Sequence, residues 1–106
     1  MNGFEKIILG LIKDFNKKDL EYAVERNISL AKLILTYEPH LITFARLAYP
    51  FLKNDGHLIN YRTVTSWLKE VRPDLYEVIV TSRKAQIWLE KQINEVKKLI
   101  LEGAVL

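Results

Sequence analysis

The last third of the chain carries the sequence pattern that most restricts the fold. Over residues 74–102, eight positions recur at alternating four- and three-residue steps, and six of them are apolar. Such spacing places the apolar side chains along one side of a helix. The eight positions are Leu75, Ile79, Ser82, Gln86, Leu89, Ile93, Val96 and Ile100. The segment is predicted to be one helix over 74–102, or a short helix followed by a second over 83–102, since Thr81 or Ser82 can cap a new helix.

Helical spacing also recurs in the four segments that precede it. The further predicted helices cover residues 3–15, 20–37, 39–53 and 61–71. Asp19 is the expected N-cap of the second helix, with Asn16 as the other candidate. No alternation typical of a β-strand appears in the sequence. We therefore predict an all-α fold, a single compact bundle of about five helices with a long C-terminal helix.

Length and composition favour one soluble domain. The chain has 106 residues, 49% of them hydrophobic, which is enough for a core. Cysteine is absent, which excludes disulfides, thiolate zinc sites and thiol catalysis and fits a reducing, cytoplasmic location. The longest apolar run is about five residues, against the roughly 20 of a membrane span. Few Gly, Pro and Met beside abundant Ile, Leu, Lys and Glu is typical of heat-adapted proteins.

The small net positive charge is compatible with an anionic partner but does not by itself predict one. Sixteen basic and 13 acidic residues give a net charge of +3, and the two signs are interleaved along the chain. The predicted surface is mildly basic. It is compatible with nucleic acid, although it lacks the dense Lys/Arg stripe of a strong phosphate binder.

Patterns that carry catalysis or metal binding are not found in the sequence. His40 and His57 fall in separate predicted turns, and neither has another ligand at metal-binding spacing. The four glycines are scattered, so no glycine-rich loop is present to hold a phosphate. We expect no cofactor, no metal, no small-molecule substrate and no enzymatic activity.

A turn and a polar-sided helix stand out between residues 55 and 72. Asp55-Gly56 marks the turn, and Asn60 is a candidate N-cap for the helix over 61–71. Pro73 is expected to force Arg72 out of the helical region. The apolar side of this helix is formed by Tyr61, Val64, Trp67, Leu68 and Val71. The side expected to face solvent is formed by Arg62, Thr63, Thr65, Ser66, Lys69 and Glu70.

Residues 41–72 resemble a helix-turn-helix DNA-binding unit. The run Thr63-Val64-Thr65-Ser66-Trp67-Leu68 is similar to the recognition helix of that family, in which apolar residues dock and small hydroxyl residues face the groove. The resemblance implies duplex DNA binding, usually by a dimer. The groove contacts predicted for this chain are Arg62, Thr63, Thr65, Ser66 and Lys69. The predicted phosphate contacts are Lys53, Arg72, Arg83 and Lys84.

The alternative is a helical protein–protein interaction subunit, which docks on a larger assembly or a second copy through its C-terminal helix. An unbroken helix over 74–102 would be about 44 Å long. A compact domain of this size has a radius of gyration of roughly 13 Å. Part of the apolar side would then be left for a partner, unless it covers earlier helices of the same copy. The expected interface residues are Trp88, Leu89, Ile93, Val96 and Ile100.

Overall fold

The computed structural model describes residues 10, 12–37, 39–40, 42–43, 47 and 61–102, without the side chains of residues 100–102. Over these residues it contains five continuous helices and no strand, so the predicted all-α bundle is confirmed. The Cα radius of gyration is 13.2 Å. Within the described part of the chain, no helix has the length and apolar character required to cross a membrane.

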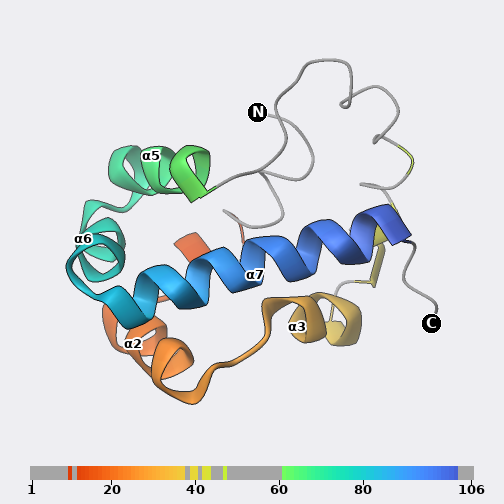
Figure 1. The fold of residues 1–106 in the computed structure, drawn as a ribbon, viewed down its shortest axis with the longest axis horizontal. Coiled ribbons are helices and arrows are strands. Elements are labelled where there is room, and N and C mark those ends of the chain that lie inside the picture. The colour runs from red at the N-terminus through yellow and green to blue at the C-terminus, as the bar shows by residue number, and fades with distance from the viewer. Residues whose placement is uncertain are drawn as a thin grey trace.

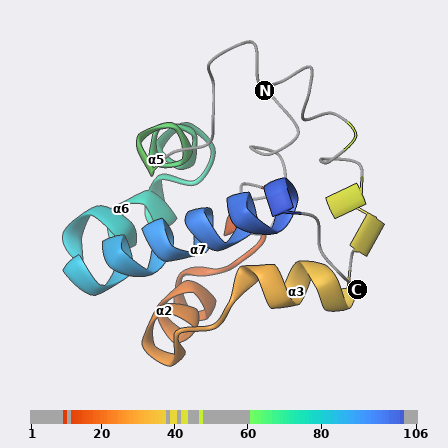
Figure 2. The same ribbon diagram turned by 45° about the vertical axis from the view of Figure 1, so that its right-hand side comes forward.

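Helix α7 (Arg83–Glu102) runs through the middle of the molecule, and the other helices pack around it. Helices α5 (Tyr61–Val71) and α6 (Pro73–Thr81) lie near its start. Helices α2 (Lys17–Arg26) and α3 (Leu30–Tyr37) follow it on another side (Figure 1). Figure 2 shows α5 above α6 and α7, with α2 and α3 below. Buried apolar side chains from all five helices join in one core.

The predicted helix over residues 20–37 is wrong, because the chain leaves the helix at Asn27. Asn27 adopts the left-handed conformation, with φ 53° and ψ 46°, which asparagine tolerates better than most residues. Its backbone N–H donates to the carbonyls of the last turn of α2. Ser29 then starts α3, since its Oγ accepts a hydrogen bond from the Lys32 N–H at 3.3 Å.

Side chains of α7 form hydrogen bonds with backbone groups of the segment between α2 and α3. The Trp88 Nε1–H donates to the Ile28 carbonyl oxygen at 3.1 Å. Gln92, only 1% exposed, accepts the Leu30 N–H on its Oε1 at 2.9 Å. Polar backbone groups that are buried without a partner destabilise a fold. The two α7 side chains therefore make the break between α2 and α3 compatible with burial.

Asn16, not Asp19, is the N-cap of α2, so the choice of Asp19 was wrong. The Asn16 Oδ1 accepts the Asp19 N–H at 2.8 Å, and the Asp19 Oδ2 accepts the Asn16 N–H at 3.4 Å. This is a reciprocal capping box in which Asp19 is the third helical residue. Asp19 therefore contributes to the cap from inside the helix.

The two later joints follow the local sequence. The predicted helix over 61–71 is confirmed as α5, and Arg72 leaves the helical region with φ −141° and ψ 77° before Pro73 opens α6. A single helix over 74–102 is wrong, and the two-helix interpretation is confirmed. The chain is extended at Ser82, whose Oγ accepts the Ala85 N–H at 3.2 Å.

The break at Ser82 also removes the excess length expected of the C-terminal helix. The 20 residues of α7 span about 30 Å, against a longest dimension of 35 Å for the molecule. Most of the predicted helices over 3–15 and 39–53 lie outside the described residues, as do the turn at Asp55-Gly56 and the cap at Asn60.

Candidate nucleic-acid interface

Helix α5 is fixed to the bundle by one apolar side. Val64 and Leu68 are fully buried, and Tyr61 and Trp67 are half-buried against the same core. The helix contacts α6 and α7. An 11-residue helix that buries a side against two others has a defined orientation, so its opposite side is held in place.

The opposite side of α5 is open and carries hydrogen-bond donors. Arg62, Ser66 and Lys69 are all exposed. At about 100° per residue, these three positions fall within an arc of about 60° that faces away from Val64 and Leu68. We call Arg62, Ser66 and Lys69 the α5 stripe. Glu70, also exposed, adds one acidic group beside it.

Thr65 does not belong to this open side, and the expectation that it faces solvent is wrong. The residue is only 7% exposed. Its hydroxyl donates to the carbonyl oxygens of Tyr61 at 2.9 Å and Arg62 at 3.1 Å, one helical turn back. Around the helix, Thr65 lies between Leu68 and Lys69, and its side chain is buried. Its burial removes the basis for a groove contact, and Thr63 is itself only half-exposed.

Arg72 is engaged within the protein at the joint between α5 and α6. Its Nε and Nη2 donate to the two carboxylate oxygens of Asp74 at 3.0 and 2.8 Å, and its Nη1 donates to the Lys13 carbonyl oxygen. The hydrogen bond from Arg72 holds the pKa of Asp74 below its ordinary value, and the same bond raises the pKa of Arg72. We therefore assign Arg72 to positioning this joint, in place of the expected phosphate contact.

The edges where α5 meets α6 and α7 contain aromatic and acidic groups. The Lys69 ammonium lies 5.7 Å from the centroid of the Tyr76 ring, a cation–π contact that leaves the side chain exposed. Burial raises the pKa of Tyr61, and the negative charge of Glu90 on α7 raises it further. Glu90 therefore lies close to the start of α5.

The remaining predicted phosphate contacts differ in their surroundings. Arg83 is exposed at the start of α7. The Lys84 Nζ forms an ion pair with the Glu25 Oε2 at 3.0 Å, and both side chains are exposed. Lys53 lies outside the described residues. Among the described cations of the predicted set, Arg62, Lys69 and Arg83 thus form no ion pair with another described side chain.

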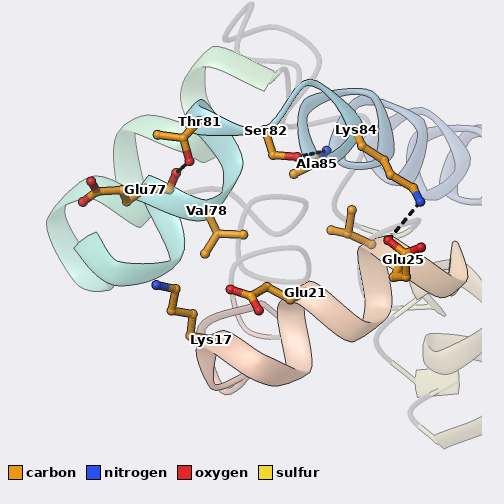
Figure 3. A pocket seen from close by; sticks show the side chains of 10 residues that line it. Lys17, Glu21, Glu25, Glu77, Val78, Thr81, Ser82, Lys84 and Ala85 are labelled. Carbon is orange, nitrogen blue, oxygen red and sulfur yellow. Dashed lines mark hydrogen bonds and ion pairs between the residues drawn. The ribbon is translucent and has the colours of Figure 1, made fainter.

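Lys84 also lines a groove of about 320 Å³ between α2, α6 and the start of α7 (Figure 3). Figure 3 shows Lys17 and Glu21 next to each other on α2, with Glu77 of α6 across this groove. Its rim mixes both signs of charge and its floor includes Val24, Val78 and Ala85. This mixture gives the groove no preference for an anion, so we do not assign nucleic-acid contacts to it.

The expected interface on the C-terminal helix is part of the monomer's own core. Leu89 and Val96 are fully buried, Ile93 is 2% exposed and Trp88 is 3% exposed. The side chain of Ile100 is not among those described. The apolar side of α7 is covered because α2, α3, α5 and α6 all contact this helix. Burial within one copy removes the basis for an interface through Trp88, Leu89, Ile93 and Val96.

Sequence reasoning missed two cations on the outward side of α7, Lys91 and Lys98. Both are exposed, as is Arg83, which lies on the same side of the helix. The signal in the sequence was the spacing of Arg83, Lys91 and Lys98, which are separated by eight and then seven residues and so fall on one side of a helix. It was overlooked because the predicted site was centred on the helix over 61–71.

Comparisons with known proteins found no matching family model, curated protein or solved structure. Within the part of the chain that the structure describes, no group of three or more His, Cys, Asp or Glu side chains is placed to hold a metal ion. The function of the chain must therefore be argued from its own surface.

Proposed function

We propose that this chain is a small non-enzymatic protein that binds duplex DNA through α5. The observation that carries the proposal is the α5 stripe, in which two cations that form no ion pair with a described side chain lie with a hydroxyl on the open side of a helix anchored by its other side. This combination of a fixed helix and outward donors supports nucleic-acid recognition.

The chemistry of the stripe fits the edges of a DNA major groove. The groove is roughly 12 Å wide and admits one α-helix. An arginine pairs with the O6 and N7 of guanine through two donors, and serine pairs with several base edges. In this arrangement Arg62 and Ser66 face the bases. Lys69, further along the helix, contacts a backbone phosphate.

The α5–α6 joint supports the proposal by limiting how α5 can move. The two hydrogen bonds from Arg72 to Asp74 tie the end of α5 to the first turn of α6. The bond from Arg72 to the Lys13 carbonyl oxygen ties the same joint to an earlier part of the chain. A pre-oriented helix loses less conformational freedom when it binds.

Docking of a protein partner through the apolar side of α7 is not proposed, because Trp88, Leu89, Ile93 and Val96 are buried in the monomer. The same burial leaves the expected dimer without its contact surface. DNA binding is therefore proposed for the single chain.

The test is a fluorescence anisotropy titration of a labelled mixed-sequence duplex at several salt concentrations. We expect Arg62→Ala with Lys69→Ala to weaken binding and to make the fall of log affinity with log salt less steep by about 0.9, since Lys69 is the residue of the pair assigned to a phosphate. Lys18→Ala with Lys32→Ala removes the same charge from exposed positions on α2 and α3 and is the matched control.

A second control separates the open side of α5 from its buried side. Thr65→Val keeps the shape of the side chain and removes its hydroxyl, so duplex affinity should not change. The proposal is overturned if the wild-type protein does not bind duplex at low salt. It is also overturned if the α5 variant and its matched control bind alike.

A further inference from the structure

The outward side of α7 has the largest excess of one charge among the described helices. Its exposed residues include four basic side chains and one acidic side chain. By contrast, exposed acidic and basic groups balance on α2, and those on α6 are acidic. The exposed charged residues of α7 are Arg83, Lys84, Glu90, Lys91 and Lys98.

Three of these cations have no carboxylate partner among the described side chains. Lys84 is paired with Glu25, but Arg83, Lys91 and Lys98 form no ion pair with another described side chain. The acidic Glu95 of the same helix is turned toward α3, where its Oε2 accepts the Ser29 hydroxyl at 3.0 Å. Arg83, Lys91 and Lys98 are therefore exposed and open to contact by an anion.

The three cations also share one line along the helix. At about 1.5 Å per residue, Arg83 and Lys91 are about 12 Å apart along the axis, and Lys91 and Lys98 are about 10 Å apart. At about 100° per residue the three fall within an arc of about 80°. The major groove of DNA is roughly 12 Å wide. Successive cations on this line therefore match the separation of phosphates on the two sides of a groove.

We propose that Arg83, Lys91 and Lys98 form a second contact surface, which binds the phosphate backbone of duplex DNA without reading its sequence. The inference rests on the proposed function and extends it from one helix to two. Contacts to phosphate come largely from Lys and Arg and supply a salt-dependent, sequence-independent part of the affinity.

The two surfaces are neighbours on the molecule. Helix α5 contacts α7, and the charge of Glu90 acts on Tyr61 at the start of α5. Figures 1 and 2 both show α5 beside the first half of α7. Glu90 is the acidic group at this edge, so Glu90→Gln should increase duplex affinity by removing its repulsion of phosphate.

The same cations would also attract an anionic membrane, but among the described side chains on this side of α7 the one large apolar group exposed to enter it is Ile87. An interfacial helix inserts an apolar side into the lipid. Trp88, Leu89, Ile93 and Val96 are buried in the core, and Ile87 is 54% exposed. The chemistry of the surface therefore favours nucleic acid.

The decisive variant is Lys91→Gln with Lys98→Gln in the full chain, compared with Lys18→Gln with Lys32→Gln as the charge-matched control. Loss of two phosphate contacts should make the fall of log affinity with log salt less steep by about 1.8. The affinity ratio of wild type to variant should then shrink about tenfold between 50 and 200 mM salt. The control should bind like wild type, and matching thermal unfolding curves will show that both variants fold.

Each outcome decides the inference. If the α5 variant weakens binding but the α7 variant matches its control, the α7 surface is rejected and the proposed function stands. If the α7 variant weakens binding and the α5 variant does not, the α7 surface stands and the role of the α5 stripe fails. If the protein binds vesicles of equimolar phosphatidylcholine and phosphatidylserine but no duplex, both are rejected.

Discussion

Helices α5 and α7 each have an apolar side, but they are covered to very different extents. Helix α5 lies at one edge of the bundle, contacts α6 and α7, and leaves Arg62, Ser66 and Lys69 open. Helix α7 contacts every other labelled helix, and Trp88, Leu89, Ile93 and Val96 of its apolar side are buried. Its outward side alone remains available.

The difference shows that the apolar side of a helix does not by itself reveal whether it packs in the core or against another protein. On α7 the apolar side had two interpretations, a docking surface or a core, and burial by four other helices decides for the core. On α5 the polar side is the more informative one, because charged side chains that are not paired usually stay exposed to solvent. Its charged residues can therefore be expected at the surface. The open sides of both helices are therefore where a function is to be sought.

The strongest test of this comparison is Leu89→Ala on the inner side of α7. Leu89 is fully buried, so the change leaves a cavity, and we expect the free energy of unfolding to fall by about 3 kcal/mol. Urea unfolding followed by circular dichroism measures it. Ile87→Ala, two residues away and 54% exposed, is the matched control and should change stability by less than about 0.5 kcal/mol. Equal effects at the two positions would contradict the enclosed position of α7.

A second variant tests whether α7 supports the break between α2 and α3. Gln92→Ala leaves the buried Leu30 N–H without the Oε1 acceptor and should lower the free energy of unfolding by about 1–3 kcal/mol. Amide hydrogen exchange should quicken first at Leu30. Asn94→Ala, exposed on the same helix, is the control. Unchanged exchange at Leu30 would show that the break does not depend on α7.

The smallest effect is expected at the joint that ends α5. Because the hydrogen bond from Arg72 lowers the pKa of folded Asp74, the unfolded chain binds more protons once the pH falls below about 5. The stabilisation is present above the ordinary carboxyl pKa of about 3.9 and is lost as the pH falls through the lower folded value.

Asp74→Asn should therefore make stability less dependent on pH in the acid range, as measured by urea midpoints at successive pH values. Glu77→Gln removes a carboxylate elsewhere on α6, away from the hydrogen bonds of Arg72, and is the control. An acid response of Asp74→Asn identical to that of wild type would mean that the joint is not held by this pair.

Local features of the chain were enough to predict much of the fold. Helical spacing predicted α5, and Pro73 fixed the joint after it because a proline restricts the residue that precedes it. The spacing also placed Arg62, Ser66 and Lys69 on one open side. These predictions succeeded because periodicity and proline geometry act over a few neighbouring residues.

Other features depended on residues that are distant in the sequence. Thr65 was expected in solvent because its own helix does not show which neighbours cover it. The break at Asn27 was missed because the groups that make it tolerable, Trp88 and Gln92, lie some 60 residues further along. The sequence gives the identity of these side chains but does not show which of them are in contact in the folded protein.

The sequence by itself determined that this chain forms helices, where Pro73 separates two of them, and which positions of α5 carry charge. The tertiary structure decided that the apolar side of α7 is filled by the chain's own helices, and that Arg83, Lys91 and Lys98 share one open line. The physical reason is that helical periodicity follows from local backbone geometry, whereas burial depends on which distant segments pack together.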